Sequence, residues 1–140
     1  MDGHRRTLGG RRDLLAPAAS FPQRYPGLLQ SVVSGTPQAR RDLLFATTGE
    51  SIALHADGVV RDETGRALPG RFLDLLDARW SELRIDQPTD ETLPFRGGWL
   101  LFLGYELAGE IEPRLRLHPH AVLPGALALR CPAAAIGDHA

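Results

Sequence analysis

Three carboxylates follow the most apolar stretch of the sequence closely: Glu106, Glu110 and Glu112. Carboxylates are among the side chains that serve as general acids and bases in enzymes. Glu106 ends an apolar run, where burial would raise the pKa of its carboxyl group. The alternative is that Glu106 caps a strand at the surface or pairs with a cation such as Arg96, because structural ion pairs also perturb carboxylates. We favour this second interpretation.

Histidine and cysteine offer two further kinds of chemistry. His118 and His120 would share one face of an extended segment, but a third ligand at the spacing typical of a zinc site is missing. Solvated loop histidines are therefore the favoured interpretation. Cys131 lies in an apolar segment without a neighbouring base, so we expect a buried, inert thiol rather than a nucleophile.

Length and composition narrow the class of protein. A chain of 140 residues is expected to form one core. Its 16 Lys and Arg against 17 Asp and Glu give a formal net charge of -1, which does not favour nucleic acid or an anionic membrane as a partner. The single cysteine cannot form an internal disulfide, and the longest apolar run, 99–103, is too short for a bilayer span. We expect a cytoplasmic protein.

The elements that must position these residues follow from hydrophobic periodicity and from turn residues. Short strands are predicted where apolar and β-branched residues cluster between turn residues, over 28–33, 42–46, 50–55 and 59–62. The Asp57-Gly58 pair favours a two-residue hairpin turn, so the last two of these strands are expected to pair antiparallel.

One amphipathic helix is predicted over 71–84. Its apolar residues follow helical spacing and indicate one buried stripe: Phe72, Leu73, Leu75, Leu76, Trp80 and Leu83. A shorter helix is expected over 13–19, with Pro17 ending or kinking it. Residues 1–12 carry two arginine pairs and nothing that would bury them, so we expect a flexible N-terminus there and a folded region over 13–140.

The segment 99–107 has apolar residues at both odd and even positions, which predicts a strand buried on both faces. The segment 110–124 contains prolines at 113, 119 and 124 and is expected to be an irregular connection. A last strand is predicted over 126–136, interrupted at Pro132. Together these elements predict an α+β fold, with an antiparallel or mixed β-sheet and one main amphipathic helix.

Three segments, in this order, resemble the amino-terminal region of the chorismate-utilising enzymes: YPGLLQS at 25–31, RRDLLFA at 40–46 and LPFRGGWLLFLGYELAGEIEP at 93–113. The resemblance is to component I of aminodeoxychorismate synthase (para-aminobenzoate synthase), with component I of anthranilate synthase as the near relative. The third segment is the most specific. The resemblance extends from about residue 14 to His139, and Asp138-His139 looks like the end of a family strand.

The resemblance implies an incomplete part of the chorismate-utilising fold, with residues 13–140 as a truncated anthranilate synthase component I N-terminal-like domain. In the family, component I aminates chorismate with ammonia from a glutamine amidotransferase subunit and with magnesium, toward folate or tryptophan. The chorismate-binding half, which holds the magnesium, would be absent from this chain. We therefore expect no catalytic residue, no cofactor and no activity in the chain alone. A separately encoded catalytic half and the amidotransferase are the implied partners.

The same region of the family holds a tryptophan pocket, which is regulatory in anthranilate synthase. By resemblance its residues map to Ser31, Gln38, Ala39, Arg40 and Arg41. An indole pocket needs apolar walls with a few placed polar groups. The mapped pocket residues give the alternative function, which is a stand-alone regulatory module that binds an aromatic amino acid such as tryptophan.

Overall fold

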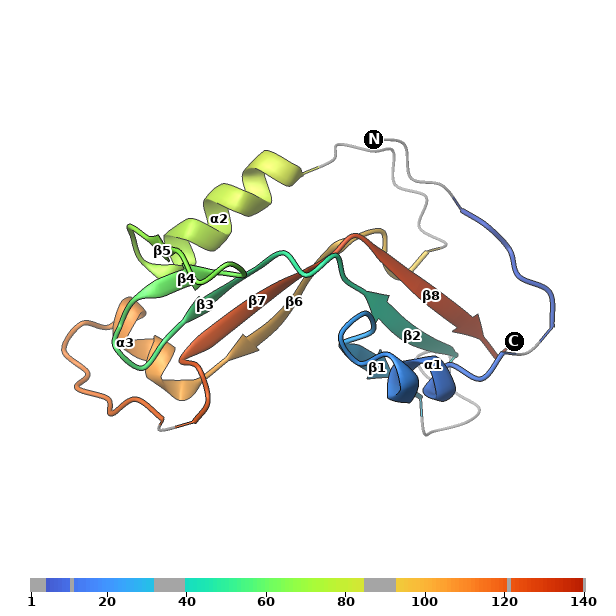
Figure 1. Cartoon of the computed structure of the whole chain (residues 1–140), viewed down its shortest axis with the longest axis horizontal. Helices are drawn as coiled ribbons and strands as arrows, with labels where there is room; N and C mark the ends of the chain where they lie inside the picture. Colours follow the sequence, from blue (N-terminus) through green and yellow to red (C-terminus); the bar gives the residue numbers. More distant parts are fainter. Residues whose placement is uncertain (1–4, 11, 32–39, 85–92, 121, 140) are drawn as a thin grey trace. The chain divides into compact units, whose positions relative to one another are not determined.

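A computed structural model of the chain describes residues 5–10, 12–31, 40–84, 93–120 and 122–139. The chain divides into two compact units. Unit 1 comprises Met1–Thr48, Gln87–Gly98 and Cys131–Ala140, and unit 2 comprises Gly49–Asp86 and Trp99–Arg130. The strands form one three-stranded and one five-stranded sheet (Figure 1). The predicted α+β class is confirmed.

The five-stranded sheet has the strand order β5-β4-β3-β7-β6. Its strands are β3 (Ser51–Leu54), β4 (Val60–Asp62), β5 (Ala67–Leu68), β6 (Gly98–Leu103) and β7 (Ala126–Cys131). Strands β3, β4 and β5 form the antiparallel meander that the turn residues predict, and β3 also pairs antiparallel with β7. After β6 come the 3₁₀ turn η2 (Tyr105–Leu107) and the short helix α3 (Ala108–Ile111).

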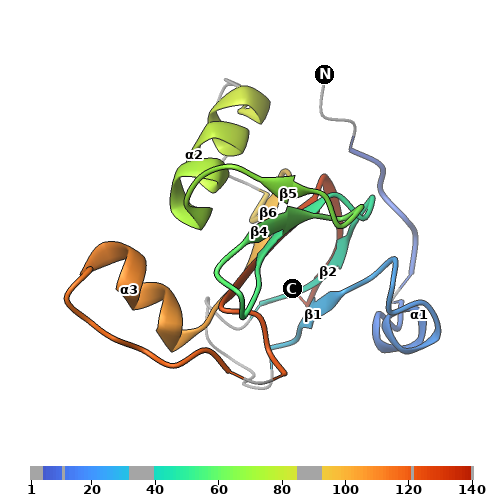
Figure 2. The ribbon, with the colours of Figure 1, turned by 60° about the vertical axis from the view of Figure 1, so that its left-hand side comes forward.

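The core of unit 2 forms between this sheet and the helix α2 (Phe72–Leu83), the main helix predicted from the sequence (Figures 1 and 2). Phe72 is fully buried against Ile52 of β3 and Val60 of β4. The small side chains of Ala126 and Ala128, on one face of β7, are also completely buried. The small residues let the aromatic ring and the branched side chains pack closely, as protein interiors require.

The three-stranded sheet of unit 1 has the order β1-β2-β8 and is antiparallel throughout. Its strands are β1 (Gly27–Leu29), β2 (Arg41–Ala46) and β8 (Ala133–Asp138), and the short helix α1 (Leu15–Ser20) precedes β1. Leu44 and Phe45 of β2 are buried, and the Phe45 ring lies edge-on to Phe95 with ring centroids 5.0 Å apart. The predicted break at Pro132 is confirmed, because β7 ends at Cys131 and β8 begins at Ala133.

Several sequence predictions need correction. The first strand is described over 27–29 only, and part of its predicted range lies outside the described residues. The loop of the hairpin between β3 and β4 is longer than the predicted two residues. The His55 amide donates a hydrogen bond to the Val59 carbonyl, and Gly58, inside the loop, adopts a φ of 76°. A glycine in this left-handed conformation is typical of three-residue hairpin loops.

Two further corrections concern apolar residues that the sequence places in the core. Trp80 is 48% exposed, and the Arg84 guanidinium lies 5.4 Å from the centroid of its ring. Strand β6 ends at Leu103 rather than 107 and lies at an edge of its sheet, with its last residues exposed. The prediction of a strand buried on both faces is therefore wrong for this chain. Across the described residues, no helix has the length and hydropathy needed to cross a membrane.

Candidate functional site

The predicted binding residues that the structure describes gather at one end of the three-stranded sheet. Arg41 and Asp42 begin β2, and Asp138 ends β8. Because the two strands are antiparallel, the start of one lies opposite the end of the other, and Arg41 is the register partner of Asp138. Oppositely charged side chains therefore meet at this end.

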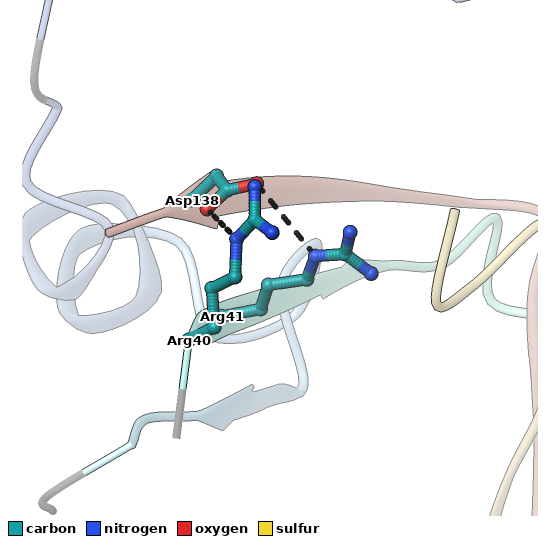
Figure 3. A network of polar contacts seen from close by, with 3 residues as sticks. All are labelled: Arg40, Arg41 and Asp138. Atoms are coloured by element: carbon teal, nitrogen blue, oxygen red, sulfur yellow. Dashed lines mark hydrogen bonds and ion pairs between the residues drawn. The ribbon is translucent and has the colours of Figure 1, made fainter. Parts of the chain in front are cut away.

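The Asp138 carboxylate forms ion pairs with both Arg40 and Arg41 (Figure 3). The Arg40 guanidinium donates two hydrogen bonds to this carboxylate, from Nε to Oδ1 at 2.7 Å and from Nη2 to Oδ2 at 2.9 Å. Arg41 Nε lies 3.8 Å from Oδ2 of the same carboxylate. The bonds from Arg40 raise the pKa of its guanidinium further. The two strand ends are thus joined by a forked, charge-assisted contact, the geometry in which arginine binds carboxylates best.

Asp42 is the more buried carboxylate of the site, with 12% of its side chain exposed. Its Oδ2 lies 3.0 Å from Nε2 of His139, and its Oδ1 accepts the backbone N–H of Ser31 at 2.9 Å. The hydrogen bond from His139, and after it the one from the Ser31 amide, lower the pKa of the Asp42 carboxyl. Asp42 therefore fixes both the backbone at Ser31 and the ring after β8.

Three of the predicted binding residues are brought together by this arrangement: Ser31, Arg40 and Arg41. Gln38 and Ala39 lie outside the described residues. The charged groups bind one another, so the site is an internally neutralised cluster that fastens β1, β2 and β8 at one end. The roles of Asp138 and His139 were not predicted from the residues. Arg40-Arg41-Asp42 lies at the beginning of β2 and Asp138-His139 at the end of β8, and this pattern points to a contact only once the two strands are known to pair antiparallel.

Of the carboxylates after β6, Glu110 has a structural role in unit 2. Glu110 of α3 accepts the backbone N–H groups of Phe72 at 2.8 Å and of Leu73 at 3.1 Å, and Arg71 bonds the Glu110 carbonyl oxygen. These N–H groups open α2 and have no partner within the helix. Glu106 is half-buried in η2. The contacts of Glu110 therefore serve to cap α2.

The two loop histidines are exposed and the cysteine is buried, as predicted from the sequence. His120 is exposed, and its Nδ1 accepts the backbone N–H groups of Val122 at 3.2 Å and Leu123 at 3.0 Å. His118 is exposed in the same loop, and Cys131 is fully buried at the end of β7. Within the described ranges, no group of three or more His, Cys, Asp or Glu side chains is arranged to hold a metal ion.

Comparisons with known proteins show which fold the chain has. Among sequences, neither a family model nor a curated protein matches the chain. Among solved structures, it is similar to anthranilate synthase component I from Streptococcus pneumoniae TIGR4, with a TM-score of 0.58 and 22% sequence identity. The match covers 99% of this chain and 30% of that chain.

The chain has the fold of part of anthranilate synthase component I. The fold expected from the resemblance to the chorismate-utilising enzymes is thereby confirmed. The chain spans less than a third of the length of the protein that it matches.

In this anthranilate synthase-like fold, the most specific segment of the sequence, 93–113, includes β6, η2 and α3. Gly104 joins β6 to η2 and donates its N–H to the Gly125 carbonyl at 2.9 Å. A Cβ atom at position 104 would lie 2.8 Å from that carbonyl oxygen, closer than such atoms approach. The Gly125 N–H in turn bonds the Leu54 carbonyl at 2.8 Å. The glycine of the LGYE sequence therefore permits a close approach of two backbone segments.

Proposed function

We propose that this chain supplies the amino-terminal part of component I of an aminodeoxychorismate synthase-like protein, which aminates chorismate toward para-aminobenzoate and folate. In this proposal the chain is not catalytic by itself. A chorismate-binding half completes the fold, and a glutamine amidotransferase subunit supplies ammonia. The amination of chorismate toward anthranilate is the related reaction that the test must distinguish.

The observation that supports this proposal most strongly is the match of almost the whole chain to 30% of anthranilate synthase component I. The segment 93–113, which carries the closest resemblance to the aminodeoxychorismate synthases, supports the choice within the family. Its residues perform specific structural tasks: Gly104 allows two backbones to approach, and Glu110 caps α2. Glu110, His120 and the Asp42–His139 pair are engaged in local or structural contacts, which agrees with a supporting role.

The test combines the chain with the chorismate-binding half of component I from the same organism. Chorismate, magnesium and ammonium are supplied, and the products are separated by liquid chromatography. We expect aminodeoxychorismate from the mixture and none from either polypeptide alone. Anthranilate as the product would assign the chain to the tryptophan branch. Turnover by the 140-residue chain alone would refute the proposal.

We propose tryptophan binding at the charged cluster as a second candidate function, favoured by the convergence of Ser31, Arg40 and Arg41 on one end of the sheet. In this proposal Ser31 contacts the ligand. Its backbone N–H is bound by Asp42, which fixes the position of the residue. Arg40 and Arg41, which both approach Asp138, would act by positioning this end of the sheet.

Calorimetric titration with tryptophan tests the second function. A saturable heat that Ser31→Ala abolishes and that Ser20→Ala leaves unchanged would support it. Ser20 is a suitable control because it is an exposed serine at the end of α1. The absence of a saturable heat in the unmodified protein would refute it.

A further inference from the structure

Strand β6 combines the sequence of an interior strand with a position at the edge of a sheet. Its residues, Gly98–Leu103, contain no charge and no proline. Successive side chains of a strand point to opposite faces, so Leu101 and Leu103 share one face and Phe102 lies on the other. Apolar residues on both faces are typical of strands with neighbours on both sides and layers above and below. In the sheet order, however, β6 is the terminal strand.

The exposure of β6 is confined to its second half. Trp99 is partly buried against the core of unit 2 and anchors the beginning of the strand. Leu101, Phe102 and Leu103 are 45%, 41% and 53% exposed. Tyr105, which follows directly, is also exposed. With respect to the described residues, both faces of the strand and its outer backbone edge are therefore open together at this end.

Edge strands in natural proteins are protected from pairing by short length, charges or prolines. The opposite edge of the same sheet follows this rule, because β5 is only two residues long, Ala67–Leu68. Strand β6 has six residues and carries none of these sequence features. Its open edge is thus suited to receive a further strand.

We infer that β6 is the docking edge for a β-strand of the chorismate-binding half, which adds to the sheet and covers Leu101, Phe102 and Leu103. This inference rests on the proposed function. The coverage supports this occupant, because 99% of the chain matches only 30% of anthranilate synthase component I, and most of that polypeptide therefore lies beyond the matched part. The incoming strand must be uncharged where it faces β6, because the side chains around the new contact are apolar.

The inference is tested by hydrogen exchange on the chain, alone and mixed with the chorismate-binding half from the same organism. Alternate N–H groups of an edge strand point away from its sheet, and a docked strand would bond them. We expect exchange in β6 to slow on mixing. Leu101→Lys should weaken association about tenfold or more, because it places a charge in an apolar contact. Leu15→Lys is the matched control, because Leu15 is a comparably exposed leucine of α1.

Every outcome decides the inference. Slower exchange in β6, together with association that Leu101→Lys weakens and Leu15→Lys does not, supports it. Restored amination of chorismate without slower exchange in β6 would overturn the inference and leave the proposed function standing. Association without amination, with β6 protected, would support the docking edge and refute the proposed function. The absence of both association and amination would overturn both. Protection of β6 in the isolated chain, with a dimer in sedimentation analysis, would identify a second copy as the occupant and overturn the inference.

Discussion

The contact between Glu110 and the beginning of α2 allows a sharp prediction about stability. The helix begins after Arg71, which provides no side-chain cap, and Glu110 accepts the N–H groups of Phe72 and Leu73 at 2.8 and 3.1 Å. Replacing a helix-capping side chain by alanine costs about 1 kcal/mol, and a hydrogen bond to a charged group contributes about 1.5–3 kcal/mol. Water can reach this part-buried site and restore some of the loss, so we expect Glu110→Ala to lower the free energy of unfolding by about 2 kcal/mol.

Urea denaturation followed by tryptophan fluorescence measures this effect. Both tryptophans, Trp80 and Trp99, belong to unit 2, so the signal reports on the unit that contains the contact. With a slope of about 2 kcal/mol per molar urea, the midpoint should fall by about 1 M. Glu110→Gln keeps one acceptor oxygen and should lose about half as much. Glu112→Ala is the control, because its side chain accepts a local bond from the Arg114 amide at 3.3 Å. Equal midpoints for Glu110→Ala and Glu112→Ala would refute the reasoning.

Three further predictions concern the glycine contact, the charged cluster and acid stability. Gly104→Ala should lower the unfolding free energy by about 1–3 kcal/mol in the same urea assay, because the new Cβ would meet the Gly125 carbonyl at 2.8 Å. The control Gly109→Ala, in α3 with its nearest contact at 3.8 Å, should be neutral or stabilising. Asp42→Ala should accelerate hydrogen exchange in β2 and β8 more than Asp138→Ala does, because Asp42 is the more buried acceptor; the reverse order would contradict the account. The pKa of Asp42 is lowered by His139 and Ser31, and that of Asp57 to about 2 by Arg61. Carboxylates with a lowered pKa in the folded state stabilise it above their ordinary value, near 4, and lose this contribution as the pH falls through the folded value. The urea midpoint should therefore fall as the pH is lowered from about 4 toward 2, and less steeply in Asp57→Asn.

The sequence predicted the elements whose signals are local. The helical spacing from Phe72 to Leu83 and the proline at 132 led to α2 and to the break between β7 and β8. The partners of charged residues were not predictable in this way. Glu110 lies 38 residues from Phe72, and Arg40 lies 98 residues from Asp138. Such pairs follow only from the strand register and from the path of the chain.

Strand β6 shows a different limit of sequence reasoning. Its apolar residues correctly indicate side chains that favour burial, but a pattern along one chain does not say what covers them. The structure places the strand at an edge and leaves Leu101, Phe102 and Leu103 exposed. The error in the prediction is therefore informative, because it draws attention to three apolar side chains that are exposed at the edge of a sheet.

In the proposed function, this chain contributes structure, and not catalysis, to a chorismate-aminating enzyme. The most direct measurement is the rate of aminodeoxychorismate formation by the chorismate-binding half at a fixed concentration, as increasing amounts of this chain are added. The account predicts no product from the chain alone and a rate that rises and saturates as the chain is added. Product from the chain alone, or a rate that does not respond to it, would contradict the account.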